Sequence, residues 1–423
     1  MGFFGADTSP ITVIDLGSHQ TRALIASLYS DGGTELLGFG QRKTVGVSEG
    51  LIIDPRWAEQ SVSDVVASAE NLANLKVTKA YVALSNKMIR SVTVTLEQAL
   101  RGEVISAGLC AELRRAAEEQ AAARLADTVQ WAHLHIIPLG YSVDGSEPTD
   151  HPDGLYGSTL RAQFHVVSVP MMTVNNLRQC FALNGIEVER FILAPYAAAL
   201  GTLDRAGQQY GATVVDLGGD TTSLAAFGRF KLMQTAVLPF GGNDVTRDIA
   251  THFGFNEERA EKLKVTEGNL AASLTPSPSH RAIDHAATLF NAKAFEHADL
   301  NPIVEARVRE ILLAVQETLA SPGFQRNGAH TLLLTGAGSQ LKGLLAYAEH
   351  MFHDKRVRLA VPSGLPGAPE VVMGAGFATV SGLLDYAVKC RLQQMGASGL
   401  LDRARRAPQR LVGVPLVQRL FGG

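Results

Sequence analysis

The sequence predicts an α/β protein with two lobes, because one strand–turn–strand motif occurs twice, about 200 residues apart. The first copy reads ITVIDLGSHQTRALIAS, from Ile11 to Ser27, and the second reads ATVVDLGGDTTSLAAF, from Ala212 to Phe227. In each copy a β-branched run ends in Asp-Leu-Gly and a second apolar run completes a β-hairpin. At 423 residues the chain also exceeds the size of one hydrophobic core, so two or more lobes are expected.

The turns that follow Asp15 and Asp216 predict a phosphate site. Glycine permits a positive φ and lets a phosphate approach the backbone N–H groups closely. Two such hairpins that face each other can clamp one polyphosphate and its metal ion. A single Asp-Leu-Gly would indicate only an ordinary hairpin turn.

A third glycine turn comes late in the chain, within TLLLTGAGSQLKGLL from Thr331 to Leu345. The pattern predicts a buried strand, a glycine turn and the start of a helix. Gly336 and Gly338 leave room for a flat base or ribose against the backbone. A dinucleotide-binding fingerprint is discarded, because its third glycine would fall on Leu341 and no acidic ribose ligand follows at the expected spacing.

Taken together, these three elements resemble the actin, Hsp70 and sugar-kinase ATPase superfamily. The resemblance implies an actin-like (ribonuclease H-like) two-lobed ATPase fold that binds ATP and Mg²⁺, with a connecting helix at Ala194 to Ala199. Asp15 and Asp216 would hold the metal, through water. The nucleotide-binding positions that it implies are Asp15, Gly17, Ser18, His19, Gln20, Asp216, Gly218, Gly219, Asp220, Thr221, Thr222, Gly242, Glu261, Lys264, Gly336, Ala337, Gly338 and Gln340.

The segment from about Ser85 to Val167 predicts an insert of a strand, a helix over Cys110 to Leu125 and two more strands. Its end carries Ile-Pro-x-x-Tyr and Gly-Leu-x-Gly-x-x-Leu-x-Ala-x-x-His-Val, which looks like the bacterial division protein family FtsA. That family has a relocated subdomain, 1C, at this place. The run AVLPFGGNDVTRDIATHFG is also similar, and the resemblance extends from about Ile11 to Leu384.

The resemblance to FtsA implies a division of the chain into subdomains and a tail. The expected parts are 1–84 with 168–200 and 366–392 (1A), 85–167 (1C), 201–240 with 320–365 (2A), 241–319 (2B), a flexible linker at 393–410 and a membrane-targeting tail at 411–423.

A helix around Pro302 to Leu319 is predicted in 2B, the part of FtsA that binds the C-terminal peptide of the tubulin homologue FtsZ. By resemblance, Arg307 contacts that peptide, and an Arg can pair with a carboxylate bidentately. A solvated surface Arg is the alternative. The family also implies that the chain forms filaments with itself and recruits other divisome proteins through 1C.

The C-terminal residues predict a short amphipathic helix. If Pro415 opens it, one face carries Leu416, Val417, Leu420 and Phe421, and an arginine cluster precedes it. So short a segment should fold only at an interface, and arginines attract anionic lipid. FtsA ends in such a membrane-targeting helix, which implies the cytoplasmic face of the inner membrane at the division septum. A plain disordered tail is the alternative.

Departures from the superfamily pattern imply weak or absent ATP hydrolysis. Asp220 and Ala337 stand where glycines are usual, and the position that often orients the attacking water falls on Ala194. The resulting hypothesis is an FtsA-like scaffold that tethers FtsZ filaments to the membrane. The alternatives are a PilM-like actin homologue of a pilus platform and a sugar kinase or phosphohydrolase.

Composition restricts the remaining classes. The net charge of −3 gives no support for nucleic-acid binding, and three scattered cysteines indicate neither disulfides nor a zinc site. The N-terminal residues show no secretion signal, and no apolar run is long enough to span a bilayer, so a cytoplasmic body is expected. His133 and His135 are two apart on a strand, so they are expected on one face as structural histidines.

Overall fold

A computed structural model describes residues 10–29, 32–126, 128–274, 297–327, 330–362 and 367–394. The predicted membrane-contacting residues Leu416, Val417, Leu420 and Phe421 lie outside these ranges, as does most of the predicted linker. In the described part, no helix has both the length and the apolar character needed to cross a bilayer.

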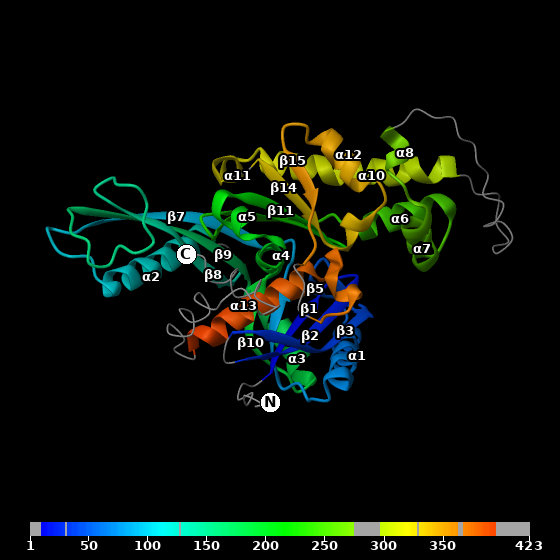
Figure 1. The fold of residues 1–423 in the computed structure, drawn as a ribbon, viewed down its shortest axis with the longest axis horizontal. Helices are drawn as coiled ribbons and strands as arrows, with labels where there is room; N and C mark the ends of the chain where they lie inside the picture. Colours follow the sequence, from blue (N-terminus) through cyan, green and yellow to red (C-terminus); the bar gives the residue numbers. More distant parts are fainter. Residues whose placement is uncertain are drawn as a thin grey trace.

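The first predicted hairpin forms the middle of a five-stranded sheet. The strand order is β10-β6-β1-β2-β3, with β1 antiparallel to β2 and parallel to β6 (Figure 1). We call this sheet and the helices packed on it the first lobe. Its elements are β1 (Ile11–Leu16), β2 (Gln20–Leu28), β3 (Thr34–Lys43), α1 (Pro55–Ala73), β6 (Lys79–Leu84), α3 (Met171–Leu183), β10 (Glu187–Leu193) and α13 (Ala378–Gln394).

Alternation along β1 explains how the sheet is covered on both faces. Ile14 and Leu16 pack with α1 and α3, whereas Ile11 and Val13 pack with α13. Successive side chains of a strand point to opposite faces, so a strand buried on both sides is apolar throughout. Asp15 therefore points to the α13 face, toward the middle of the molecule.

The second predicted hairpin has the same register in a second five-stranded sheet, of order β13-β12-β11-β14-β15. Asp15 is paired with Arg22 in the first hairpin, and Asp216 is paired with Ser223 in the second. This sheet and its helices form the second lobe. Its elements are α5 (Arg205–Tyr210), β11 (Ala212–Leu217), β12 (Thr222–Gly228), β13 (Lys231–Leu238), α6 (Gly242–Phe253), α7 (Glu257–Glu267), α8 (Ala271–Leu274), α10 (His297–Leu319), α11 (Pro322–Asn327), β14 (Thr331–Thr335), α12 (Leu344–Met351) and β15 (Arg356–Leu359).

The predicted insert is a strand, a helix and two strands, and it extends to the left of Figure 1, away from α6 and α7. It comprises β7 (Arg90–Ala99), α2 (Ala107–Arg124), β8 (Trp131–Val143) and β9 (Thr159–Pro170), with strand order β7-β9-β8. The helix begins earlier than predicted, because Ser106 caps it by accepting a hydrogen bond from Leu109 N at 3.2 Å.

The prediction that His133 and His135 share one face is wrong. They pair with the adjacent residues Ser168 and Val167 of β9, because a β-bulge lies between them. His133 Nδ1 is 2.7 Å from Ser168 Oγ, and His135 Nε2 accepts a hydrogen bond from Leu193 N at 3.0 Å. Both are structural histidines, as expected.

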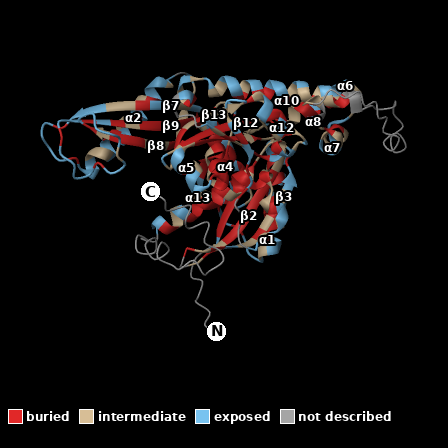
Figure 2. Cartoon of the chain, turned by 45° about the horizontal axis from the view of Figure 1, so that its top comes forward, coloured by how far each residue is buried: buried red, intermediate tan, exposed pale blue. Residues whose placement is uncertain are grey.

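Two helices cross between the lobes, α4 (Ala194–Thr202), at the predicted connecting position, and α13. Their contact is close because both carry glycine there. A Cβ on Gly382 would lie 1.8 Å from Ala197 O, and a Cβ on Gly201 would lie 2.4 Å from Ala378 O. Buried residues lie around this crossing, on the two five-stranded sheets and on the strands of the inserted subdomain (Figure 2).

Short elements complete the connections around the crossing. These are β4 (Val47–Ser48), β5 (Leu51–Ile52) and three 3₁₀ turns, η1 (Ala337–Gln340), η2 (Glu370–Met373) and η3 (Ala375–Phe377). The subdomain boundaries within the two lobes remain predictions.

Candidate functional site

The first turn, the second turn and the late glycine turn converge on one cavity of about 590 Å³. Of the predicted nucleotide-binding residues, those that line it are His19, Gln20, Gly218, Gly219, Gly242, Glu261, Lys264, Ala337, Gly338 and Gln340. Those that lie outside its lining are Asp15, Gly17, Ser18, Asp216, Asp220, Thr221, Thr222 and Gly336.

The two turns touch each other across the cleft between the lobes. His19 Nδ1 is 3.0 Å from Asn243 Oδ1, and a Cβ on Gly219 would lie only 2.8 Å from His19 Cβ. Gly241 is equally constrained, since its Cβ would lie 2.2 Å from Gly219 O. Glycine at position 219 therefore lets the second turn approach the first turn at His19. Glycine at position 241 lets the start of α6 approach the backbone of the second turn.

Asp15 and Asp216 lie close enough for their charges to interact. Burial raises the pKa of Asp15 to about 6; the positive charge of Arg22 opposes that rise, and the negative charge of Asp216 adds to it. Burial also raises the pKa of Asp216, although a hydrogen bond from Thr379 Oγ1 at 3.1 Å opposes the rise. A Cβ on Gly336 would lie 2.1 Å from Asp216 Oδ1, so glycine gives this carboxylate its space.

Two carboxylates whose charges interact are a type of donor set that a divalent cation can use. Mg²⁺ is commonly held by one or two carboxylates, with phosphate oxygens and water completing its shell. The described residues contain no group of three His, Cys, Asp or Glu side chains that could hold a metal ion. A cation bound near both carboxylates would relieve the repulsion between their charges.

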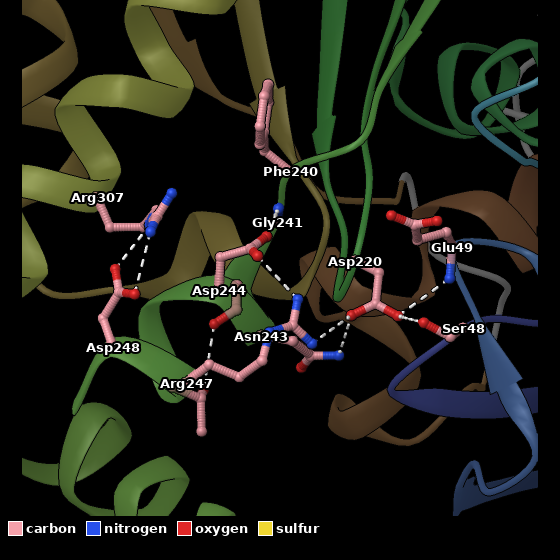
Figure 3. A network of polar contacts seen from close by, with 12 residues as sticks. Ser48, Glu49, Asp220, Phe240, Gly241, Asn243, Asp244, Arg247, Asp248 and Arg307 are labelled. Carbon is pink, nitrogen blue, oxygen red and sulfur yellow. Dashed lines mark hydrogen bonds and ion pairs between the residues drawn. The ribbon is translucent and has the colours of Figure 1, made fainter. Parts of the chain in front are cut away.

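Asp220 faces protein donors from both lobes (Figure 3). Its Oδ2 accepts hydrogen bonds from Ser48 Oγ and Glu49 N, both at 3.0 Å. Its Oδ1 accepts one from Asn243 Nδ2 at 2.9 Å and lies 3.4 Å from Arg247. Burial opposes ionisation, but these partners outweigh it and lower the pKa of Asp220. The carboxylate therefore joins the lobes.

Glu261 and Lys264, three residues apart on α7, form an intrahelical ion pair with 2.6 Å between Nζ and Oε2. The pair lines the cavity and is mostly buried. Lys264 Nζ also donates to Gly242 O and Thr246 Oγ1, both at 2.9 Å. Burial opposes the charge of Glu261, but Lys264 outweighs that effect and lowers the pKa of this carboxyl. Lys264 thus fixes the first turn of α6 against α7.

Several residues of the lining were not predicted from the sequence. Arg22 lies opposite Asp15 in the first hairpin, a cross-strand relationship that could have indicated it. The apolar wall could not be anticipated, because it depends on how α10 and η3 pack against the turns. This wall includes Val308, Ile311, Leu312, Leu341, Leu344 and Phe377.

Arg307 lies on α10 beside a second, surface cavity of about 490 Å³ between α6 and α10. Its guanidinium forks onto Asp248, with Nε 2.7 Å from Oδ2 and NH2 3.0 Å from Oδ1, as Figure 3 shows. NH1 donates to Glu310 at 2.6 Å. Arg307 is therefore held by the carboxylates of Asp248 and Glu310 and is not a freely solvated side chain.

Comparison with known proteins gives matches across most of the chain. The family model "Cell division protein FtsA" matches residues 213–382, and the model "SHS2 domain inserted in FTSA" matches residues 86–168. The cell division protein FtsA of Pseudomonas aeruginosa is 28% identical over 388 residues, covering 92% of this chain and 91% of that protein. FtsA of Escherichia coli K12 is 26% identical over 399 residues, covering 91% and 92%.

Solved structures with the same fold include a PilM–PilN type IV pilus biogenesis complex, with a TM-score of 0.62, 16% identity and coverage of 89% of this chain and 98% of that chain. A diol dehydratase-reactivating factor has a TM-score of 0.51 at 11% identity, covering 90% and 100%. Fold and site together define a two-lobed, actin-like protein with an inserted subdomain, as the sequence predicted. Within that class, the chain belongs to the FtsA family of bacterial cell division proteins.

Proposed function

We propose that this protein is a nucleotide-dependent scaffold of cell division. It binds ATP with Mg²⁺, polymerises, tethers FtsZ filaments to the inner face of the cytoplasmic membrane and recruits later division proteins through the inserted subdomain. The observation that carries this proposal is the convergence of three glycine turns on one cavity, together with Asp15 and Asp216, which lie outside its lining and are close enough for their charges to interact.

In this proposal the backbone N–H groups of the two turns receive the phosphates, and the loop from Gly336 to Gln340 receives the adenosine. The metal supplies charge neutralisation at the phosphates when bound, and Asp15 and Asp216 hold it. Displacement of a fluorescent ATP analogue, with and without EDTA, tests this assignment. Asp216→Asn should weaken binding in Mg²⁺ more than in EDTA; an equal loss in both would contradict a metal role.

We expect ATP hydrolysis to be slow or absent because of the residue at the start of α4. Ala194 is 7% exposed and offers no polar group to orient an attacking water. We expect nucleotide to act as a structural and polymerisation ligand. Steady-state phosphate release tests this point, and a rate typical of a metabolic kinase, on the order of 10 s⁻¹, would contradict it.

The FtsZ C-terminal peptide is proposed to bind at the cavity between α6 and α10. Asp248, His252, Pro302 and Ile303 line this cavity, which combines charge with an apolar wall. Arg307 adjoins it, and a peptide carboxylate would share or replace Asp248 on the guanidinium. Arg307→Ala should weaken binding of a labelled FtsZ peptide about tenfold or more, measured by fluorescence anisotropy.

Arg309→Ala is the matched control for that measurement, because Arg309 is exposed on the same helix. Equal affinity of the Arg307 and Arg309 variants would exclude the proposed contact. Failure of the wild-type protein to bind the peptide would instead favour an actin homologue that recognises a different partner.

Membrane attachment is proposed for the C-terminal residues, from the sequence pattern of Leu416, Val417, Leu420 and Phe421. One short segment binds weakly, whereas many in a filament bind together through effective concentration. Flotation with anionic liposomes should recover the full chain and lose a version that ends at Met395. Equal flotation of the two would remove the anchor from the proposal.

A further inference from the structure

We infer that His19, Asn243 and Asp220 form a latch between the two lobes, and that this latch sets the rate at which nucleotide enters and leaves the cavity. The inference rests on the proposed function, because it adds a means of regulation to the site that is proposed to bind ATP. It concerns the kinetics of exchange and not the contacts that give the site its affinity.

The latch joins equivalent positions of the two hairpin motifs. His19 is the fifth residue of the first motif, counted from Asp15, and Asp220 is the fifth residue of the second, counted from Asp216. The amide of Asn243, at the start of α6, contacts both residues. Its Oδ1 is 3.0 Å from His19 Nδ1, and its Nδ2 donates to Asp220 Oδ1 at 2.9 Å. One side chain therefore holds the two turns together.

The orientation of this amide is determined by the charge of Asp220. Burial opposes ionisation of Asp220, but its hydrogen-bond partners outweigh burial and lower the pKa of the carboxyl. An ionised carboxylate can only accept hydrogen bonds, so Asn243 turns its NH2 group toward Asp220. The amide oxygen then faces His19 and accepts a hydrogen bond from the imidazole N–H. Donors and acceptors therefore match at both contacts of the latch.

The first lobe also holds Asp220 from the other side (Figure 3). Asp220 Oδ2 accepts hydrogen bonds from Ser48 Oγ and Glu49 N, both at 3.0 Å, in the hairpin of β4 and β5. That hairpin is tied to its own lobe, because Gly50 N donates to Ser18 Oγ of the first turn at 3.3 Å. The first lobe therefore reaches this carboxylate directly here, and through the amide at its first turn.

The latch is part of the boundary of the cavity. His19 and Asn243 line the cavity, whereas Asp220 and Ser48 lie outside its lining. The lining comes from both lobes, so release of a ligand held between the two turns requires the lobes to separate. Separation breaks the contacts of the latch, and hydrogen bonds to a charged group are among the strong ones. Since the latch consists of protein groups alone, it should slow entry and exit by a similar factor.

The test measures the association and dissociation rates of a fluorescent ATP analogue by stopped flow, with melting temperatures as the check on folding. Ser48→Ala removes one contact of Asp220 and leaves the cavity lining intact, and Asn243→Ala removes the amide. We expect both rates to rise about tenfold in Ser48→Ala, with the dissociation constant changed by less than about twofold. In Asn243→Ala the association rate should rise by at least as much. Ser63→Ala, at an exposed serine of α1, is the matched control and should leave both rates unchanged.

Three other outcomes overturn the inference. Wild-type rates in both Ser48→Ala and Asn243→Ala would show that these contacts do not limit exchange. Faster dissociation without faster association in Ser48→Ala would indicate a weakened ligand site in place of a latch. If the wild-type protein binds no nucleotide, the inference fails together with the proposed function, and the unmodified protein alone reveals that result.

Discussion

Asp220 accepts a hydrogen bond from the Ser48 hydroxyl at 3.0 Å, and this contact joins the second turn to the first lobe. Residue 220 is 4% exposed, so its charge depends on these partners. The superfamily resemblance implies that Asp220 belongs to the nucleotide-binding residues. In the structure the same carboxylate ties together the two halves that close around the cavity.

Asp220→Ala should therefore destabilise the protein by about 2–4 kcal/mol, because it removes a buried, hydrogen-bonded charge and leaves Asn243 and Glu49 N without their acceptor. Urea unfolding measures this change. Asp64→Ala is the control, since Asp64 accepts an exposed hydrogen bond from Gln60 on the same helix. Equal free energies of unfolding in the two variants would show that the contact between the lobes contributes little.

The helix crossing predicts a second stability effect. Gly382→Ala should lower the free energy of unfolding by about 1–3 kcal/mol, because the added methyl would lie 1.8 Å from Ala197 O and force α4 and α13 apart. For Gly108→Ala we predict the opposite effect, an increase in the free energy of unfolding. Its Cβ meets only Ser106 Oγ at 3.6 Å, so the higher helix propensity of alanine should stabilise by up to about 1 kcal/mol. The same sign for both substitutions would argue against close packing at the crossing.

Buried histidines in the inserted subdomain predict acid sensitivity. Burial lowers the pKa of His165 to about 4, and burial together with the charges of His165 and Arg190 lowers the pKa of His135 to about 3. The unfolded chain binds protons on these residues below about pH 6.5, whereas the folded protein does not. The contribution of these neutral histidines to the free energy of unfolding should be fully present above that pH and decrease as the pH falls toward 4.

Replacing His165 tests this linkage, because both its ring nitrogens lack hydrogen-bond partners among the described residues. His165→Leu should change stability at pH 7 by less than about 1 kcal/mol and stabilise at pH 5 by about 2 kcal/mol. Unfolding is followed by urea titration at both values, with the exposed His350→Leu as control. If the stability of His165→Leu depended on pH as that of wild type does, His165 would be excluded as a source of the acid sensitivity.

The ion pair on α7 predicts a coupled effect on nucleotide binding. Lys264→Met removes the lysine that pairs with Glu261 in the cavity wall and leaves that carboxylate with only Thr246 and His19 near it among the described residues, so it should weaken ATP binding by about tenfold or more. The double variant Glu261→Gln with Lys264→Met should recover part of that loss, because no unpaired charge remains. A double-mutant cycle on ATP affinity measures the coupling, and strictly additive losses would show that the two side chains act independently.

Sequence patterns predicted the two hairpins, the insert and the connecting helix in their order along the chain. The repeated motif around Asp15 and Asp216 predicted two hairpins, which the structure shows to have the same register, and the insert was predicted as a strand, a helix and two strands. Local patterns succeed here because strand and helix periodicity depend on near neighbours along the chain. The same reasoning failed at His133 and His135, where a bulge imposed by pairing with β9 shifted the period.

The amino-acid sequence by itself determined the fold class, the family resemblance and the glycine turns that meet at the cavity. Only the tertiary structure decided that Asp220 bridges the lobes, that Arg307 is held by Asp248 and that the buried Nε of Arg22 has no hydrogen-bond partner among the described residues. The physical reason is that hydrogen bonding and desolvation depend on groups far apart in the chain. Ser48 and Asp220 are 172 residues apart, and no local pattern records their contact.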